Sequence, residues 1–171
     1  MRLIPCATAI LLLSNIASAD VPPPPRGPVF QLDGNALVLP ESIVFESGND
    51  KLKPASDAAL KHVVAYLTDK TYISLLRVEN HSDNAGDAKL AQSLSERRAL
   101  AITRWLVAHG ISCQRLIPVG FGASKPIASN ATPDGQAANR RSTFVNAMLR
   151  GRAIGGMPVD GGGVVAGDPC K

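Results

Sequence analysis

The sequence has few aromatic residues and only three histidines and three cysteines. Aromatic side chains make up 4% of the chain, which argues against a stacking platform for single-stranded nucleic acid. The histidines are isolated, and neither HExxH nor CxxC spacing occurs. We therefore expect no cofactor and no metal site.

The composition otherwise fits one ordinary folded domain with tails. The chain has 171 residues, of which 45% are apolar, enough for a hydrophobic core. Its formal net charge of +4 would attract nucleic acid, anionic lipid or wall polymer, and does not choose among them. Basic residues clustered with aromatic ones, which a nucleic-acid site requires, do not occur, so no nucleic-acid partner is expected.

The first 19 residues have the three parts of a secretory signal peptide. Arg2 supplies the positive start, residues 7–13 form a short apolar core, and Ala17-Ser18-Ala19 supplies a cleavage site. The apolar core falls well short of the roughly 20 residues that span a bilayer, and an uncleaved anchor helix is the alternative. Cys6 precedes the apolar core, whereas the cysteine of a lipoprotein signal follows it. The pattern predicts an exported protein.

Two segments flank the expected domain, which covers about residues 41–149. Residues 20–40 include four consecutive prolines and are typical of an extended linker and lead-in. Residues 150–171 are rich in glycine with little apolar periodicity, and we expect a mobile C-terminal tail there. After cleavage, Cys113 and Cys170 would remain in an oxidising compartment. One disulfide between them and two free thiols are equally compatible with the sequence.

Within the domain, short apolar runs alternate with segments of helical periodicity. Strands are expected at residues 43–45, 72–78, 116–119 and 143–149. One helix is expected to begin near Pro54 and a long one to run from Asp87 to Ala108. The long helix would bury Leu90, Leu94, Ala101 and Trp105, beside Ala99, Ile102 and Leu106. This order predicts a two-layer α/β sandwich of βαβαβ type, with helices packed on a mixed sheet.

Two opposite charges stand near the start of the long helix. Asp83 lies in the turn before it, where the positive end of the helix favours a carboxylate. Arg98 lies about three turns along, on the same face as Ala91. If Asp83 folds over that face, its carboxylate can take an ammonium while the guanidinium binds a carboxylate. The alternative is that Asp83 caps the helix and Arg98 makes a surface ion pair.

Two blocks of residues resemble the OmpA-like peptidoglycan-binding domain. The first is His81-Ser82-Asp83-Asn84-x-Gly86 with Leu94-Ser95-x-x-Arg98-Ala99. The second is Gly120-Phe121-Gly122, Pro126-Ile127-Ala128, Asn130 and Asn139-Arg140-Arg141. Order and spacing agree over about residues 41–147. The resemblance implies a periplasmic protein associated with the cell wall or outer membrane. It also implies the peptidoglycan stem peptide as partner, with outer-membrane or other envelope proteins as further partners.

The resemblance also implies the site residues. Asp83 and Arg98 match the residues that hold the free amine and carboxylate of diaminopimelate, and Ser82 keeps the hydroxyl of the usual threonine. Gly48 and Asn49 match the turn that lines the pocket. Arg141 matches an arginine that supports it, with a surface charge at a strand edge as the equal alternative. Binding without catalysis is expected, because no activated nucleophile or paired carboxylates are evident.

Two residues depart from the family pattern. Asn80 stands where the family usually has glycine, and Ala91 stands where asparagine is common. The missing amide at position 91 removes one ligand hydrogen bond, worth about 0.5–1.5 kcal/mol, so weaker binding is expected. These departures leave an alternative function, an OmpA-like structural or interaction module with weakened or lost ligand binding.

Overall fold

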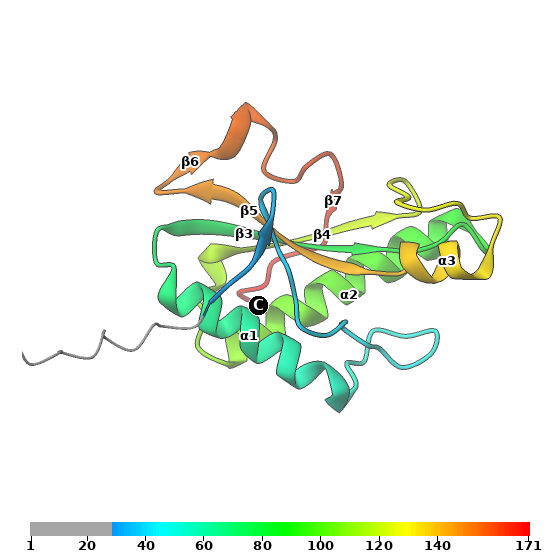
Figure 1. Ribbon diagram of the computed structural model, residues 1–171, viewed down its shortest axis with the longest axis horizontal. Coiled ribbons are helices and arrows are strands. Elements are labelled where there is room, and N and C mark those ends of the chain that lie inside the picture. Colours follow the sequence, from blue (N-terminus) through cyan, green and yellow to red (C-terminus); the bar gives the residue numbers. More distant parts are fainter. Residues whose placement is uncertain (1–28) are drawn as a thin grey trace, which may run out of the picture.

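The computed structural model describes residues 29–171 (Figure 1), so the expected signal peptide and the proline run lie outside the described residues. The helices are α1 (Asp57–Asp69), α2 (Ala88–Ala108) and α3 (Pro133–Asn139), with 3₁₀ turns at Pro54–Ser56, Cys113–Arg115 and Ile154–Gly156. The strands are β1 (Leu32–Asp33), β2 (Ala36–Leu37), β3 (Ile73–His81), β4 (Leu116–Gly122), β5 (Ser142–Leu149), β6 (Arg152–Ala153) and β7 (Val164–Val165).

The strands form one mixed sheet in the order β1-β2-β5-β3-β4-β7, and β6 pairs with β5. β3 is central: it runs parallel to β4, which follows it through the α2 crossover, and antiparallel to β5. Figure 1 shows α1 and α2 against one face of this sheet. Their buried side chains form the core with those of the strands, among them Leu60, Leu67, Leu76, Ile102 and Phe144. The predicted two-layer α/β sandwich is confirmed.

The buried face of α2 differs from the expected stripe. Leu90 is 71% exposed, whereas Ser95, Ala99, Ile102, Thr103 and Leu106 are buried. The cause is the close approach of α2 to β4 at Gly120, where an added Cβ would lie 2.6 Å from Glu96 Cγ. Only small side chains fit in this part of the interface, so Leu90 and Leu94 face the cavity described below. The stripe predicted for the first half of α2 is therefore wrong.

The strand expected at residues 43–45 is also absent. Only Phe45 forms a bridge, with Leu52, and the Val44 backbone exchanges hydrogen bonds with the Ser56 hydroxyl at 2.8 and 2.9 Å. The position beside β5 is taken by β2, through the pair Leu37 and Phe144. Residues 32–37, expected as part of the linker, thus belong to the sheet, and residues 43–53 form a loop near the helices.

The expectation of a mobile C-terminal tail is wrong. β7 pairs with β4 (Figure 1), and a disulfide joins Cys113 to Cys170. Because Leu76 and Val78 face the helices, Arg77 between them points to the opposite face, where its Nη1 donates to Val159 O at 2.9 Å. The tail therefore covers this second face. Its glycine content permits close contact, since a Cβ on Gly163 would lie 2.4 Å from Val119 Cγ1.

Within residues 29–171, no helix combines the length and apolar character that crossing a membrane requires.

Candidate functional site

A cavity of about 390 Å³ opens where β3 ends and α2 begins. Its walls come from the turn at residues 82–87, from Leu90, Ala91 and Leu94 on α2, and from Gly48 in the loop before α1. Asp83, Arg98 and Arg140 complete the lining. The fold thus brings Asp83 and Arg98 to one hollow, as the zwitterion hypothesis requires, together with apolar side chains of α2.

Asp83 is 8% exposed, and each of its carboxylate oxygens has a partner. Oδ1 accepts a hydrogen bond from Ala85 N at 3.0 Å, and Oδ2 is ion-paired with Arg140 Nη1. The cap of α2 is a different residue, Asp87, whose Oδ1 accepts from Lys89 N and Leu90 N at 2.9 Å each. Asp83 is therefore free of the capping role that the alternative hypothesis assigned to it.

Arg98 is held by the loop before α1. Its Nε donates to Asn49 O at 2.9 Å, and its Cζ lies 4.7 Å from the centre of the Phe45 ring. Burial lowers the pKa of Arg98, and the nearby Asp50 raises it in part. Among residues 29–171, Arg98 has no salt bridge within 4.0 Å. Because a guanidinium has five N–H groups, those on the two terminal nitrogens remain for a ligand.

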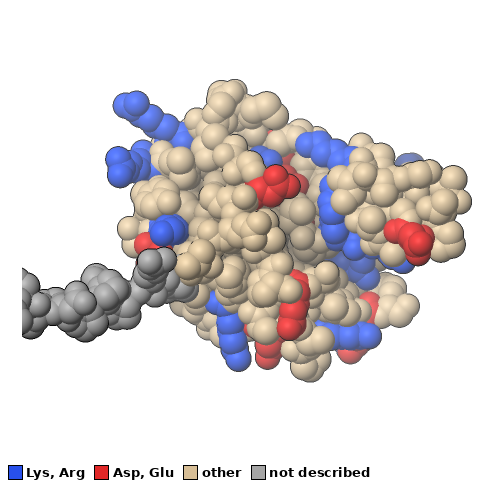
Figure 2. Space-filling view, in the orientation of Figure 1, with Lys and Arg blue, Asp and Glu red and all other residues tan. Residues whose placement is uncertain are grey.

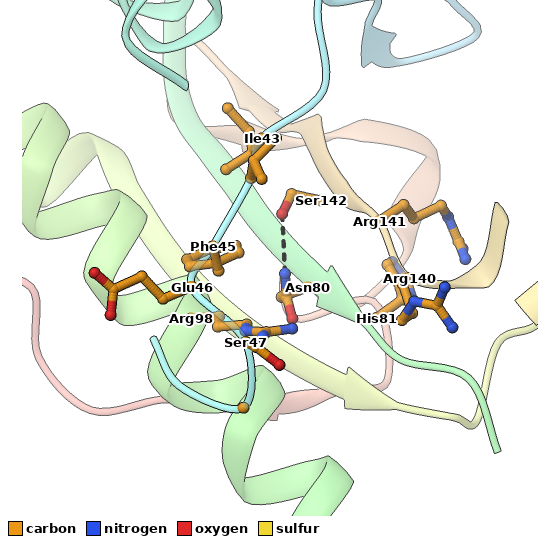
Figure 3. A pocket seen from close by; sticks show the side chains of 12 residues that line it. Ile43, Phe45, Glu46, Ser47, Asn80, His81, Arg98, Arg140, Arg141 and Ser142 are labelled. Carbon is orange, nitrogen blue, oxygen red and sulfur yellow. Dashed lines mark hydrogen bonds between the residues drawn. The ribbon is translucent and has the colours of Figure 1, made fainter. Parts of the chain in front are cut away.

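A second cavity of about 330 Å³ adjoins the first and shares Gly48, Arg98 and Arg140 with it. The remaining walls come from residues 43–47 and from Asn80, His81, Arg141 and Ser142. Figure 3 shows Asn80 between Ser142 and Arg98, with its amide nitrogen toward the serine. Figure 2 shows basic side chains gathered along the hollow beside α3. The combined lining carries three arginines, Arg98, Arg140 and Arg141, and three carboxylates, Glu46, Asp83 and Asp87.

Comparison with known proteins decides the family. Residues 44–140 match the sequence model of the OmpA family. The chain belongs to this family. It is 33% identical over 111 residues to the probable lipoprotein YiaD of Escherichia coli, covering 64% of this chain and 49% of YiaD. It is also 33% identical over 120 residues to the peptidoglycan-binding protein ArfA of Mycobacterium tuberculosis, covering 70% of this chain and 32% of ArfA.

Comparison with solved structures agrees with this family. The cell wall anchor of the type VI secretion system of Pseudomonas aeruginosa superposes with a TM-score of 0.54 at 27% identity, over 61% of this chain and 76% of that one. The chain spans about half or less of the length of the first curated relatives it matches.

The other predicted site residues of this OmpA-family chain occupy different places. Ser82 lines the first cavity, and its buried hydroxyl has no hydrogen-bond partner in the described part of the chain. Gly48 lines both cavities, whereas Asn49 acts through its backbone oxygen on Arg98. Arg141 lines only the second of these two cavities and donates to Lys125 O at 3.2 Å. Burial lowers its pKa.

Arg140 was missed as a site residue, although it stands in the Asn139-Arg140-Arg141 block. The pairing of β3 with β5 explains its position: Asn80 lies opposite Ser142, and His81 N donates to Arg141 O at 2.9 Å. Continuing this antiparallel register brings Arg140 beside the turn that carries Asp83. The sequence therefore indicates the position of Arg140 only when the pairing of β3 with β5 is known. Leu90 and Leu94 were missed as lining residues because they were assigned to the core.

A buried polar cluster supports the turn from behind. His81 is 2% exposed, its ring stacks on Phe121 with centroids 4.9 Å apart, and its Nε2 lies 3.1 Å from Glu79 Oε2. Burial raises the pKa of Glu79, but hydrogen bonds from His81, Thr143 and Arg77 outweigh it and lower the value to about 2. Burial lowers the pKa of His81. The His81-Ser82-Asp83 turn of this chain thus leaves β3 from a buried, hydrogen-bonded base.

Proposed function

We propose that this OmpA-family protein binds peptidoglycan non-covalently and so associates with the cell wall in the bacterial envelope. The observation that carries the proposal is the common cavity lined by Asp83 and Arg98, two opposite charges with an apolar wall beside them. The comparisons support it, because ArfA is a peptidoglycan-binding protein and the similar secretion-system structure is a cell wall anchor.

The ligand group that suits this cavity is the free end of diaminopimelate in the stem peptide. Its ammonium would bind the Asp83 carboxylate, and its carboxylate would take the terminal nitrogens of Arg98 in a forked pair. The methylene chain between them would lie on Leu90, Ala91 and Leu94. Each contact is a reversible binding contact, and the proposal includes no chemical step.

One observation favours the alternative, a module with weakened or lost ligand binding. Arg140 already pairs with Asp83, so an incoming ammonium has to share the carboxylate with a cation. One fact reduces this competition: the Arg140 side chain is 50% exposed, so a displaced guanidinium can return to water. A ligand that also gains the Arg98 contact can therefore bind beside Arg140 or displace it.

Co-sedimentation with purified diaminopimelate-type sacculi tests the proposal. Arg98→Ala and Asp83→Asn should each leave most of the protein in the supernatant, whereas wild type should sediment. Arg104→Ala is the matched control, because Arg104 is an exposed arginine of the same helix. Physiological salt, with a Debye length of about 8 Å, suppresses non-specific attraction by the net positive charge.

Equal retention of wild type, Asp83→Asn and Arg98→Ala would remove the basis of the proposed site. Retention of none of the proteins would favour the alternative module. Soluble fragments released from the sacculi would contradict binding without catalysis.

A further inference from the structure

Asn80 is a buried polar residue with unused hydrogen-bonding capacity at a cavity. It is 3% exposed and lines the second cavity. In the described part of the chain its side chain makes one hydrogen bond, from Nδ2 to Ser142 Oγ at 2.9 Å. A carboxamide has two N–H donors and an acceptor oxygen, so one end of this group remains unused. Figure 3 shows that end directed away from Ser142, on the side of Arg98.

The unused group is within reach of a ligand that begins in the first cavity. Both cavities share Arg98, Gly48 and Arg140, so these three residues lie where the cavities adjoin. Their volumes, about 390 and 330 Å³, are each at the lower end of the range of about 300–1,000 Å³ for small-molecule sites. A ligand longer than one amino-acid head group can therefore extend past Arg98 into the second cavity.

The second cavity favours a neutral amide over a second charged group. Apart from Arg98, which is assigned to the head group in the first cavity, its arginines have other partners: Arg140 pairs with Asp83, and Arg141 donates to Lys125 O and Asn139 O. A carboxamide, in contrast, offers a donor or an acceptor, which is what a peptide group requires. Either orientation of the Asn80 amide satisfies this, because the Ser142 hydroxyl can accept or donate.

We propose that the second cavity is a subsite for a backbone peptide group of the ligand, and that Asn80 is the residue that selects for it. This inference rests on the proposed function, since it assumes that the charged head group occupies the first cavity. It predicts that the chain distinguishes a stem peptide from the free diamino acid at its end. A glycine at position 80 would lack the side chain that makes this contact.

Calorimetric titration of two ligands tests the inference: free meso-diaminopimelate and the tripeptide L-Ala-γ-D-Glu-meso-diaminopimelate. Wild type should bind the tripeptide more tightly. Asn80→Ala should weaken tripeptide binding about 3- to 10-fold, the value of one neutral hydrogen bond, and change binding of the free diamino acid less than about twofold. Ser142→Ala keeps the Asn80 side chain but removes its hydrogen-bond partner. This variant should weaken binding of the tripeptide alone, by a smaller factor than Asn80→Ala.

Asn35→Ala, an exposed asparagine in the β1–β2 turn, is the matched control and should leave both affinities unchanged. An unchanged tripeptide affinity in both Asn80→Ala and Ser142→Ala would overturn the inference, as would an equal loss for both ligands. Those results leave the proposed function intact. If wild type binds neither ligand, the proposed function fails, and this inference fails with it. Thermal unfolding followed by circular dichroism identifies any variant that does not fold. If Asn80→Ala or Ser142→Ala does not fold, the other of the two tests the inference.

Discussion

Arg140 forms an ion pair with the carboxylate of Asp83 at the cavity that Arg98 also lines. The pair joins the residue that follows α3 to the turn after β3, two positions 57 residues apart in the sequence. Asp83 is largely buried, with 11% of its side chain exposed, whereas Arg140 is 50% exposed. The carboxylate is thus held in place by a partner that itself lies half in solvent.

This asymmetry predicts that Arg140 contributes little to stability. Arg140→Ala should lower the free energy of unfolding by less than about 1 kcal/mol, because an exposed guanidinium gains little from one ion pair. Urea unfolding followed by circular dichroism measures the change. Loss of more than about 2 kcal/mol would show that the pair is a structural element of the turn, and would make its displacement by a ligand implausible.

Position 91 offers a gain-of-affinity test. Ala91 lines the first cavity, and Ala91→Asn would supply the amide that the family commonly has there. One added hydrogen bond should strengthen tripeptide binding by up to about tenfold. Ala88→Asn, at an exposed position one turn earlier on α2, should leave the affinity unchanged. Titration of the same tripeptide compares the three proteins, and an unchanged or weaker affinity for Ala91→Asn would contradict the ligand pose.

The disulfide should stabilise the domain through its C-terminal segment. The bridge between Cys113 and Cys170 closes a loop of 57 residues and ties the β7 segment to the sheet. Changing both cysteines to serine should cost about 2–4 kcal/mol of unfolding free energy. Thermal unfolding with and without reductant checks this. The reduced wild type should have the same melting temperature as the double variant. Equal melting temperatures for the oxidised and the reduced wild type would contradict the stabilising role of the bridge.

The Glu79 cluster predicts loss of stability in acid. The pKa of Glu79 in the folded protein is about 2, below its ordinary value of 4.5. Its ionised form therefore stabilises the fold fully above pH 4.5, and this contribution, about 3 kcal/mol, disappears as the pH falls toward 2. Glu79→Gln should flatten the dependence of unfolding free energy on pH in that window, relative to wild type and to the exposed control Glu41→Gln. An unchanged slope would show that Glu79 is not the responsible group.

The sequence predicted the central elements of the fold because their signals are local. Pro54 and Asp87 mark helix starts within a few residues of those observed, and the strand at residues 72–78 corresponds to most of β3. The two-residue strands β2 and β7 have no such signal. Each exists because an edge of the sheet offers unpaired backbone groups, which a short segment can satisfy only after the sheet has formed.

The site was predictable where motif and geometry coincide. Asp83 and Arg98 were assigned through the resemblance of their motifs to the family, because their positions alone also fitted a helix cap and a surface ion pair, and both line the first cavity. Arg140 could not be assigned in the same way, because its contact with Asp83 depends on the pairing register of β3 and β5. Leu90 and Leu94 were misplaced for a related reason: helical periodicity fixes which residues share a face, but the contact at Gly120 decides which face is buried.

The most direct test of the binding site pairs one change in the protein with one change in the ligand. Two tripeptides are titrated that differ only at the third residue, meso-diaminopimelate or L-lysine, the latter lacking the carboxylate assigned to Arg98. Wild type should prefer the diaminopimelate peptide by about 10- to 100-fold, the value of a charged hydrogen bond. Arg98→Ala should bind both peptides equally weakly. If Arg98→Ala retains the wild-type preference, the guanidinium does not bind that carboxylate, and the account of the site is contradicted.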